Sequence, residues 1–355
     1  MRTKVLILGQ GLCGTWLSYF LEQAGISYIV LDKAPGITSS RVASGVINPV
    51  TGRRLQKTWM AEQLLPFAET HYKAMGALLN EELISATTIR NFFPTFQMQE
   101  AYRKVAEEDP HYVNPWSDGA EWSSYFEFMF GAGEIAPAYW IRLRTMLDAW
   151  RKKLVATNKL VEDIFEWSEV SVEQNIVHYK DIEAEYIVCC DGVAALDNPY
   201  FSRLPFAPNK GEALLLSIPG LPGGNIYKKG ITLVPWDEPG VFWAGSTYEL
   251  RFTDPGPTEQ FRTNTLLQLK NFLKLPFEVI DHWAAVRPAT VERRPFVGFH
   301  PVFPRVGILN GMGTKGCSLA PWFAKELTAH ITDNTPITPQ AAVDRFRGLL
   351  TKQIS

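Results

Sequence analysis

The sequence predicts an α/β fold, and three observations near its N-terminus support this prediction. An apolar run over residues 4–8 breaks into the glycine sequence Gly9-Gln-Gly11-Leu12-Cys13-Gly14, a second apolar run covers residues 26–31, and Asp32 follows it. Strand, glycine loop, helix, strand and acidic residue in this order form a dinucleotide-binding fingerprint. Its first glycine permits a tight turn, its second lets the backbone approach a pyrophosphate, and its third lets helix and strand pack closely.

The residues after the glycines indicate which dinucleotide is expected. A helix over 15–23 would point its positive end at the phosphates. Asp32, with Lys33 beside it, closes the second strand, where a carboxylate accepts hydrogen bonds from the adenosine ribose. Because this negative charge disfavours a 2′-phosphate, FAD or NAD is expected in preference to NADP.

The composition narrows the class of protein. The chain has 355 residues, of which 46% are hydrophobic and 20% charged, and a net charge of −2. This length predicts two domains, and this charge gives no general attraction to nucleic acid or to an anionic membrane. The four cysteines and six histidines lack metal-ligand spacing, so no metal is expected. Without a signal peptide or an apolar stretch long enough to span a membrane, the chain is expected to be cytoplasmic.

Apolar periodicity predicts the remaining elements. Residues 92–130 are rich in aromatic side chains and predict short strands and turns, which form a core or line a pocket. Residues 211–253 are again rich in β pattern. Helices are expected over 60–85, 138–153 and 258–272, and further strands over 161–165, 170–173, 176–179, 184–190 and 306–309.

A second glycine loop follows the last predicted strand. It contains Gly311, Gly313 and Gly316 and leads into a helix that runs to about residue 330. The two glycine loops could form two separate nucleotide sites, or they could bind the two ends of a single cofactor. Since no acidic residue closes a following strand, one long cofactor such as FAD explains both loops. The first helix would then face the pyrophosphate, and the last would direct its N-terminal donors at the flavin ring.

Several further segments occur in an informative order. They are RVASGVINPV from Arg41, VCCDG ending at Gly192, GSTYE from Gly245, AVRPATVERRPFVG from Ala285 and GMGTKGCSLAP from Gly311. Together with the fingerprint, they resemble the D-amino acid oxidase and glycine oxidase family of FAD-dependent oxidoreductases. The last loop is also similar to the oxidase half of the bifunctional enzymes that trim a carboxymethylaminomethyl group from a tRNA wobble uridine.

The resemblance implies a fold and a domain division. The fold is of the glutathione-reductase-like, D-amino acid oxidase type, with a Rossmann-like FAD-binding domain and a mainly antiparallel β substrate domain. The FAD-binding domain is expected over residues 1–80, 134–203 and 285–355, and the substrate domain over 81–133 and 204–284.

The resemblance also implies cofactor contacts. Residues 40–46 match the loop that runs beside the pyrophosphate and the flavin, and residues 311–317 match the loop around the pyrimidine end of the flavin ring. Ile164 matches a strand residue that contacts the adenine side through its backbone. Gly192 matches the glycine that lets the chain pass close to the cofactor. Covalent-flavin relatives carry a cysteine just after the substrate arginine, whereas residues 288–293 contain none, so noncovalent FAD is expected. The candidate cofactor residues are Gly9, Gly11, Leu12, Cys13, Gly14, Asp32, Lys33, Ser40, Arg41, Ala43, Gly45, Val46, Ile164, Gly192, Gly311, Gly313, Thr314, Lys315, Gly316 and Cys317.

Arg287 matches the arginine that pairs with the substrate carboxylate in glycine-oxidase-like members. A guanidinium fits this role because its fork of donors holds a carboxylate bidentately. The alternative is a structural salt bridge to Glu292 or Asp281. Where such members carry a second arginine, this chain has Thr314 with Lys315 beside it.

Three other residues are weaker candidates. Tyr248 and Trp243 lie in the strand region that faces the flavin in relatives, and either could wall the pocket or pack in the core. His282 could be proposed as a base, but a lone histidine is more typical of a hydrogen-bonded structural residue.

The function predicted is FAD-dependent oxidation of a C–N bond in a small amine or amino acid, by hydride transfer to flavin and hydrolysis of the imine. Its substrate would be glycine, an N-substituted glycine or a D-amino acid, and Arg287, Lys315 and Tyr248 are the candidate catalytic residues. Oxygen, a quinone or another protein could reoxidise the flavin. The alternatives are the tRNA wobble-uridine oxidase activity, a flavin hydroxylase or other FAD oxidoreductase, and a nucleotide-binding sensor or scaffold.

Overall fold

A computed structural model describes residues 1–33, 36–52, 54–173 and 176–352, and it divides the chain into two compact units. The first unit comprises residues 1–41, 144–209 and 286–355, and the second comprises 42–143 and 210–285. The chain therefore crosses from one unit to the other four times.

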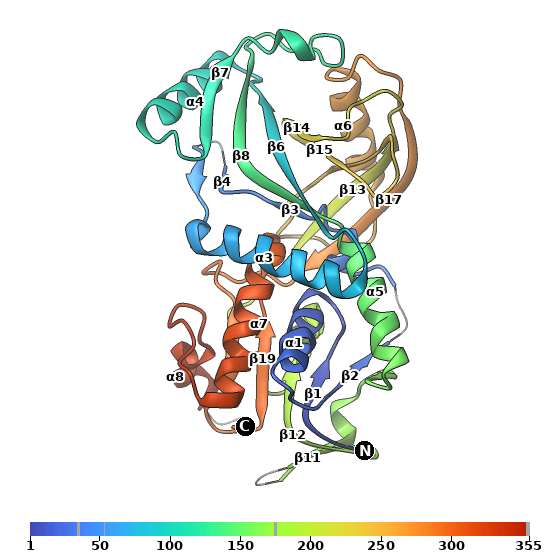
Figure 1. Ribbon diagram of the computed structural model, residues 1–355, viewed down its shortest axis with the longest axis vertical. Coiled ribbons are helices and arrows are strands. Elements are labelled where there is room, and N and C mark those ends of the chain that lie inside the picture. Colours follow the sequence, from blue (N-terminus) through green and yellow to red (C-terminus); the bar gives the residue numbers. More distant parts are fainter. Residues whose placement is uncertain (34–35, 53, 174–175, 353–355) are drawn as a thin grey trace. The chain divides into compact units, whose positions relative to one another are not determined.

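The first unit is built on an eight-stranded sheet (Figure 1). Its path is β10-β11-β12-β1-β2-β9, and β19 pairs with β12 and with β18. The pairs β9/β2, β2/β1, β1/β12 and β12/β19 are parallel, whereas β10, β11 and β18 run antiparallel to their partners. The strands are β1 (Arg2–Leu8), β2 (Tyr28–Asp32), β9 (Leu160–Glu162), β10 (Val170–Val172), β11 (Val177–Tyr179), β12 (Ile182–Cys189), β18 (Phe296–Phe299) and β19 (Val306–Asn310).

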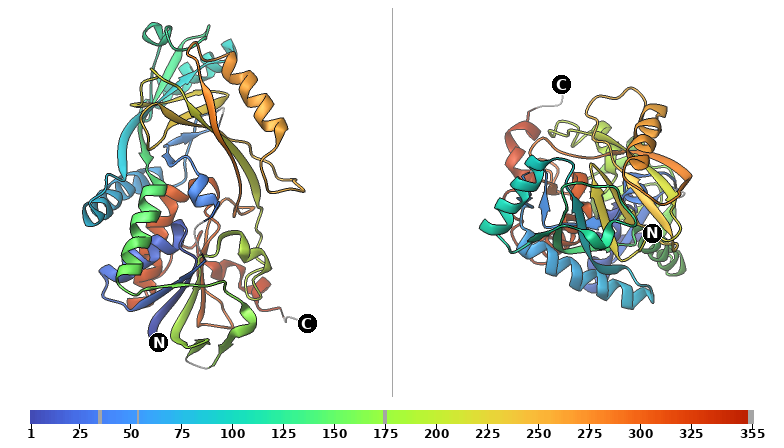
Figure 2. Two further views of the ribbon diagram at one scale, coloured as in Figure 1. Left: turned by 90° about the vertical axis from the view of Figure 1, so that its right-hand side faces the viewer. Right: turned by 90° about the horizontal axis from the view of Figure 1, so that it is seen from above.

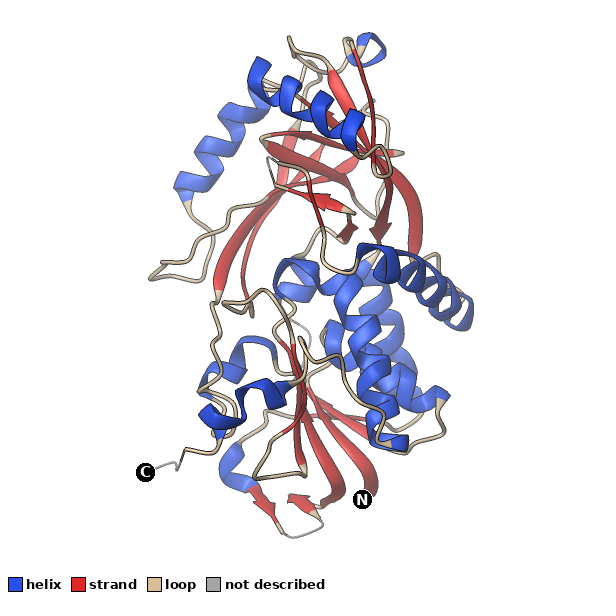
Figure 3. Cartoon of the chain, turned by 90° about the vertical axis from the view of Figure 1, so that its left-hand side faces the viewer, coloured by secondary structure: helices blue, strands red, loops and turns tan. Residues whose placement is uncertain are grey.

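Helices cover this sheet because its strands are apolar on both faces. Leu6, Ile187 and Ile308 are fully buried, as expected for parallel strands with elements on each side. Helices α1 (Leu12–Gln23) and α7 (Gly316–Asp333) pack against each other. Helix α5 (Leu143–Ala156) and the short α8 (Arg347–Leu350) belong to the same unit, and Figure 3 shows helices on the two sides of the sheet.

The second unit holds a nine-stranded sheet that is mostly antiparallel. Its path is β17-β13-β16-β15-β14-β6-β8-β3, and β7 pairs with β8. The pair β14/β6 is parallel. The strands are β3 (Val46–Ile47), β6 (Ile84–Phe92), β7 (Val113–Ser117), β8 (Ala132–Ile141), β13 (Asn209–Ser217), β14 (Asn225–Lys229), β15 (Ile231–Pro235), β16 (Val241–Gly245) and β17 (Glu278–Arg287), while β4 (Val50–Thr51) and β5 (Gln56–Lys57) form a separate ribbon.

Aromatic side chains fill the core of the second unit. Phe92, Phe126 and Phe272 are each 1% exposed, and the rings of Phe126 and Phe272 stack with centroids 4.5 Å apart. Helices α3 (Ala61–Leu79), α4 (Phe96–Glu108) and α6 (Glu259–Lys270) complete the unit, and Figure 2 shows α6, in orange, beside the sheet. The aromatic residues of segment 92–130 thus include core residues.

The structure corrects three sequence expectations. Helix α4 occupies part of the segment expected to hold only strands and turns, and Thr95 caps it by accepting a hydrogen bond from the Met98 amide at 3.3 Å. Residues 138–141, expected to be helical, end β8, because they pair with β6 and β3. Residues 42–80 and 134–143, expected in the same domain as the fingerprint, lie in the second unit.

Two further observations concern shorter elements and membranes. The short helix α2 spans Ser39–Val42, and single 3-10 turns cover Ala120–Trp122, Trp167–Glu169, Gly192–Asp197, Gly313–Lys315 and Val343–Phe346. Among the described helices, none combines the length and the apolar character that a membrane crossing requires.

Candidate functional site

The candidate cofactor residues of the first unit gather at one edge of its sheet. The parallel strands β1, β12 and β19 end at Leu8, Cys189 and Asn310, so the segments that follow them meet at this edge. In open α/β sheets, ligands bind at the carboxyl ends of the strands. The two glycine loops, far apart in sequence, are thereby brought together.

The first glycine loop is closely packed. A side chain at Gly14 would place its Cβ 1.8 Å from the Gly9 carbonyl oxygen. Gly9 itself has φ +92°, which favours glycine, and its Cβ would lie 2.7 Å from the Cys190 carbonyl oxygen. Helix α1 therefore begins directly against the end of β1, with its N-terminal amides at the carboxyl edge of the sheet.

Ser40 shares the start of α1. The Leu12 amide donates to its hydroxyl at 3.1 Å, and a Cβ on Gly11 would lie 3.1 Å from the same oxygen. Arg41 follows, forms an ion pair with Asp148 of α5, and accepts a hydrogen bond at its carbonyl from Arg144 at 3.0 Å. The structure thus places the predicted residue Ser40 beside the glycine loop, and it places Arg41 against α5.

Asp32 ends β2 and is held by two donors. Its Oδ1 accepts from the Gln10 amide at 3.0 Å, and its Oδ2 accepts from Arg151 of α5 at 2.7 Å. Arg151 is 8% exposed and also donates to Glu162 at 2.6 Å and to the Lys33 carbonyl at 3.2 Å. The orientation of the carboxylate is therefore fixed by Arg151, whose role no local sequence pattern indicates.

The turn after β12 contains the partly buried carboxyl group of Asp191. Asn310 donates to Asp191 at 3.1 Å and to the Gly192 carbonyl at 2.9 Å, which joins the ends of β12 and β19. Burial raises the pKa of Asp191 to about 6, although hydrogen bonds act in the opposite direction. Gly192 has φ +60°, a backbone conformation that glycine adopts readily.

The pKa of Asp191 predicts a pH-dependent stability. Because the folded-state pKa lies above the ordinary value of 3.8, its contribution is present at pH 4 and is lost as the pH rises through 6. Replacing Asp191 with asparagine should therefore stabilise the protein more at pH 8 than at pH 5, by about 1.4 kcal/mol, because pH 5 lies about one unit below the folded-state pKa. Thermal unfolding of both proteins at the two pH values measures this, with the exposed Asp197→Asn as control. An equal effect of Asp191→Asn at both pH values would contradict it.

The second glycine loop leads into α7. A Cβ on Gly316 would lie 3.1 Å from a side-chain carbon of Leu12, so the N-terminal ends of α7 and α1 adjoin. Lys315 occupies the position before α7, and Thr314 is exposed. Burial raises the pKa of Cys317, and separately that of Cys13, to about 12, so neither thiol is a reactive thiolate at neutral pH.

Arg287 ends β17 close to this loop. Its Nη1 donates to Asn209 Oδ1 at 2.8 Å, and the next residue, Pro288, accepts at its carbonyl from the Gly313 amide at 3.3 Å. The two carboxylates considered as structural partners have other contacts. Glu292 pairs with Arg345 at 3.1 Å. Asp281 accepts from the amide of His282 at 2.7 Å and from the Trp283 indole. The structure therefore brings Arg287 to the loop before α7.

Ile164 differs from its expected setting. Strand β9 ends at Glu162, so Ile164 lies in the loop beyond it and its side chain is 71% exposed. Its amide donates to the Asp163 carboxylate at 2.8 Å. The strand prediction over 161–165 is wrong at this residue, because pairing with β2 extends only to Glu162. A backbone contact of Ile164 with the adenine stays a prediction.

The other candidate residues lie in the second unit. Gly45 has φ +77°, and its Cβ would lie 2.0 Å from the Ile141 carbonyl oxygen. Ala43 precedes it, and Val46 begins β3. Trp243 is 6% exposed and donates to the Val42 carbonyl at 2.9 Å, so it is a core residue, whereas Tyr248 is 52% exposed.

A buried polar cluster explains His282. Glu212 is fully buried and accepts from Lys210 at 3.2 Å, from Thr258 at 2.6 and 2.8 Å, and contacts His282 Nε2 at 3.0 Å. A buried carboxylate requires such partners. His282 therefore serves this cluster, in agreement with the structural interpretation of the sequence.

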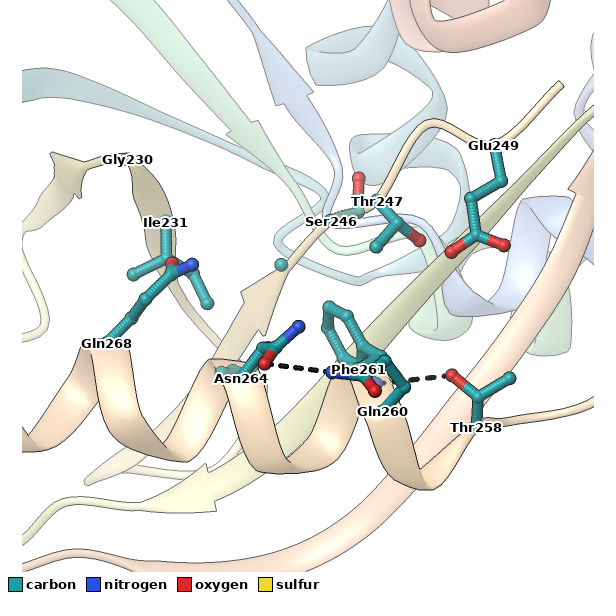
Figure 4. Close-up of a pocket in the computed structure, with 12 residues that line it drawn as sticks. Gly230, Ile231, Ser246, Thr247, Glu249, Thr258, Gln260, Phe261, Asn264 and Gln268 are labelled. Carbon is teal, nitrogen blue, oxygen red and sulfur yellow. Dashed lines mark hydrogen bonds between the residues drawn. The ribbon is translucent and has the colours of Figure 1, made fainter.

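A pocket of about 430 Å³ adjoins this cluster (Figure 4). Thr247 and Glu249 line it from the segment after β16, and Thr258, Phe261 and Asn264 line it from the start and body of α6. In the part of the chain that the structure describes, none of its lining residues comes from segment 90–130. The same part contains no group of three or more His, Cys, Asp or Glu residues arranged to hold a metal ion.

The first unit fits an extended dinucleotide. The close approach at Gly14 leaves no side chain between α1 and β1, and the N-terminal ends of α1 and α7 adjoin at the same sheet edge. Two adjoining helix N-termini favour negative charge on a ligand. Gln10, Arg151, Asn310 and Asn209 support this edge but were missed in the sequence, because their partners lie far away along the chain. Only the position of Gln10, inside the fingerprint, could have drawn attention to it.

Two curated proteins are similar in sequence. A FAD-dependent monooxygenase of Penicillium shearii is 38% identical over 73 residues, which is 21% of this chain and 15% of that protein. The tRNA 5-methylaminomethyl-2-thiouridine biosynthesis bifunctional protein MnmC of Caulobacter vibrioides is 24% identical over 344 residues, which is 92% of this chain and 54% of that protein. The chain thus spans about half or less of each.

Solved structures share the fold over nearly the whole chain. Glycine oxidase of Bacillus cereus superposes with a TM-score of 0.79 at 14% identity and covers 99% of both chains. Iminodiacetate oxidase of Chelativorans sp. BNC1 gives a TM-score of 0.74 at 17% identity and covers 94% of this chain and 96% of that one.

The sequence profile of one family agrees with this geometry. The profile of the FAD dependent oxidoreductases, abbreviated DAO, matches residues 4–330 and so includes the fingerprint, Arg287 and the second glycine loop. The sequence order, the sheet edge with its two glycine loops and this match together show that the chain belongs to the family of FAD dependent oxidoreductases.

Proposed function

We propose that the protein oxidises a C–N bond in a small amine that carries a carboxylate, such as glycine, an N-substituted glycine or a D-amino acid. One observation carries this proposal: Arg287 is held beside the loop that opens α7, at the cofactor edge of the first unit. A guanidinium in this position can bind a carboxylate in a fixed pose. FAD, when bound, would supply the acceptor for the hydride that leaves the substrate carbon, and water would hydrolyse the resulting imine.

The residues of the chain orient the reactants. Arg287 anchors the carboxylate, and Lys315, at the start of α7, adds positive charge near the same loop. Tyr248 is the proposed wall of the substrate pocket. Positioning of this kind accounts for a large part of catalysis when the cofactor supplies the reaction chemistry. No dedicated base is required if the amine binds in its neutral form.

The names of the similar structures support this substrate class. Glycine oxidase and iminodiacetate oxidase are named for small amines that carry carboxylates. We propose noncovalent FAD, reoxidation by oxygen or another acceptor, and a cytoplasmic location, as the sequence predicts. A nucleic acid partner is not part of this proposal.

A second candidate is oxidation of a carboxymethylaminomethyl group on a tRNA wobble uridine. The match to the bifunctional protein over 92% of this chain favours it. The group is itself an N-substituted glycine, so the same residues would serve. The net charge of −2 offers no general attraction to RNA, which makes this the narrower proposal.

Anaerobic spectroscopy tests both candidates. We expect the flavin absorption to bleach when glycine, N-methylglycine or a D-amino acid is added to the purified holoenzyme without oxygen. Bleaching only by a carboxymethylaminomethyl nucleoside or the modified tRNA would favour the second candidate. If no amine bleaches the flavin and NAD(P)H does, the protein is a hydroxylase and the proposal fails.

A further inference from the structure

The side-chain amide of Asn209 contains a buried N–H donor from which no described residue accepts a hydrogen bond. This residue begins β13 and is fully buried, and its Nδ2 has no hydrogen-bond partner among the described residues. Buried side-chain amides are almost always paired, because an unsatisfied donor loses its hydration without compensation. A bound ligand that accepts a hydrogen bond would explain such an unpaired donor in a native structure.

The other end of the same amide is in use. Asn209 Oδ1 accepts from Arg287 Nη1 at 2.8 Å. This contact fixes which end of the amide faces the guanidinium, because only the oxygen of the amide can accept a hydrogen bond. The Asn209 side chain therefore carries the unpaired Nδ2 donor and also binds the Arg287 guanidinium, and both residues belong to the first unit.

We infer that Asn209 and Arg287 form one carboxylate-binding pair, in which Asn209 Nδ2 donates to an oxygen of the substrate carboxylate held by Arg287. Asn209 is thus a specificity-determining residue, and it acts in two ways. Its oxygen orients the guanidinium, and its nitrogen supplies a further donor to the bound anion. The inference rests on the function proposed for Arg287.

The pair predicts a preference that Arg287 alone would not give. Acetate presents only acceptors, which match the guanidinium and Nδ2. Acetamide presents donors at one end, which meet donors on the protein. An aspartate at position 209 would keep an acceptor for Arg287, but it would replace the Nδ2 donor with negative charge. Carboxylates would then be repelled, and the amide would be accepted.

The test measures acetate and acetamide binding to the holoenzyme, by the change in the flavin visible spectrum and by the rise in Tm that ligand binding causes. Wild-type protein should bind acetate much more tightly than acetamide. Asn209→Leu should weaken acetate binding about tenfold to 100-fold, which corresponds to the loss of a hydrogen bond to a charged group. Asn209→Asp should reverse the preference in favour of acetamide. Asn91→Asp makes the same change at another buried asparagine, in β6, and should leave both affinities unchanged.

The outcomes separate this inference from the proposed function. If Arg287→Leu abolishes acetate binding while Asn209→Leu binds acetate as tightly as wild type, the inference fails and the role of Arg287 stands. A wild-type protein that binds no acetate would overturn both. Flavin content and Tm without ligand identify any variant that does not fold. If such a variant does not fold, acetate and acetamide binding are measured instead with Asn209→Ser, whose hydroxyl can donate and which should bind acetate more weakly than wild type while retaining part of the preference for acetate.

Discussion

Replacing Arg287 with leucine is expected to raise the KM for an amino acid substrate by about 30-fold to 1000-fold, since losing a charge-assisted bidentate contact costs about 2–4 kcal/mol. The side chain leaves β17 beside the second glycine loop, and its contact with Asn209 fixes its orientation. Steady-state kinetics with glycine and N-methylglycine would measure the change.

Two variants sharpen this test. Arg287→Lys keeps the charge but loses the planar fork, so its KM should lie between those of wild type and Arg287→Leu. Arg293→Leu removes an exposed arginine of the same segment and should leave KM unchanged. Equal KM values for wild type and Arg287→Leu would show that another group anchors the substrate.

Gly14→Ala is expected to produce a protein that does not retain FAD. The new methyl group would lie 1.8 Å from the Gly9 carbonyl oxygen, so α1 would have to move away from the end of β1. Overpacking of this kind costs about 1–3 kcal/mol or more, and here it would displace the helix N-terminus that we propose binds the pyrophosphate. Flavin content after purification and the Tm of the protein measure the two effects.

The matched control for this variant is Gly36→Ala. A side chain at Gly36 would meet no atom within 4 Å, and the residue is exposed. Flavin content and Tm should stay at their wild-type values in this control. A Gly14→Ala protein with full flavin content would show that the close approach of α1 to β1 is not required for cofactor binding.

The cofactor-binding edge of the first sheet could be predicted from the sequence because the residues of the dinucleotide-binding fingerprint follow one another along the chain. Strand β1, the glycine loop, α1 and β2 follow one another, and Asp32 closes the unit, so spacing alone defines them. Arg151 could not be predicted in the same way. It lies 119 residues beyond Asp32, on a helix whose pattern says nothing about its partner. The same holds for Asn209 and Arg287, which only the fold brings together.

The errors in the fold prediction have related causes. The end of β8 carries Tyr139, Trp140 and Ile141, which suit a strand, and its pairing with β6 and β3 decides the conformation. Helix α4 was missed because the aromatic residues around it dominated the pattern of the segment. The unit boundary near residue 42 falls at the end of the short helix α2, within the Ser-, Gly- and Pro-rich segment of residues 34–54, whose composition does not show at which residue the chain enters the second unit.

The crossing of the chain between units has a consequence for biosynthesis. Leu8 of β1 pairs with Cys189 of β12, and the intervening chain of about 180 residues takes a ribosome roughly 10–35 s to make. During that interval, the apolar β1 has been made and can pair with β2, but its other neighbour, β12, has not been made. Strand β12 in turn pairs with β19, which begins at Val306. A product that terminates before residue 306 therefore leaves the apolar edge of β12 without its partner strand. Such edges pair with other chains, and prematurely terminated products of this gene are therefore expected to aggregate.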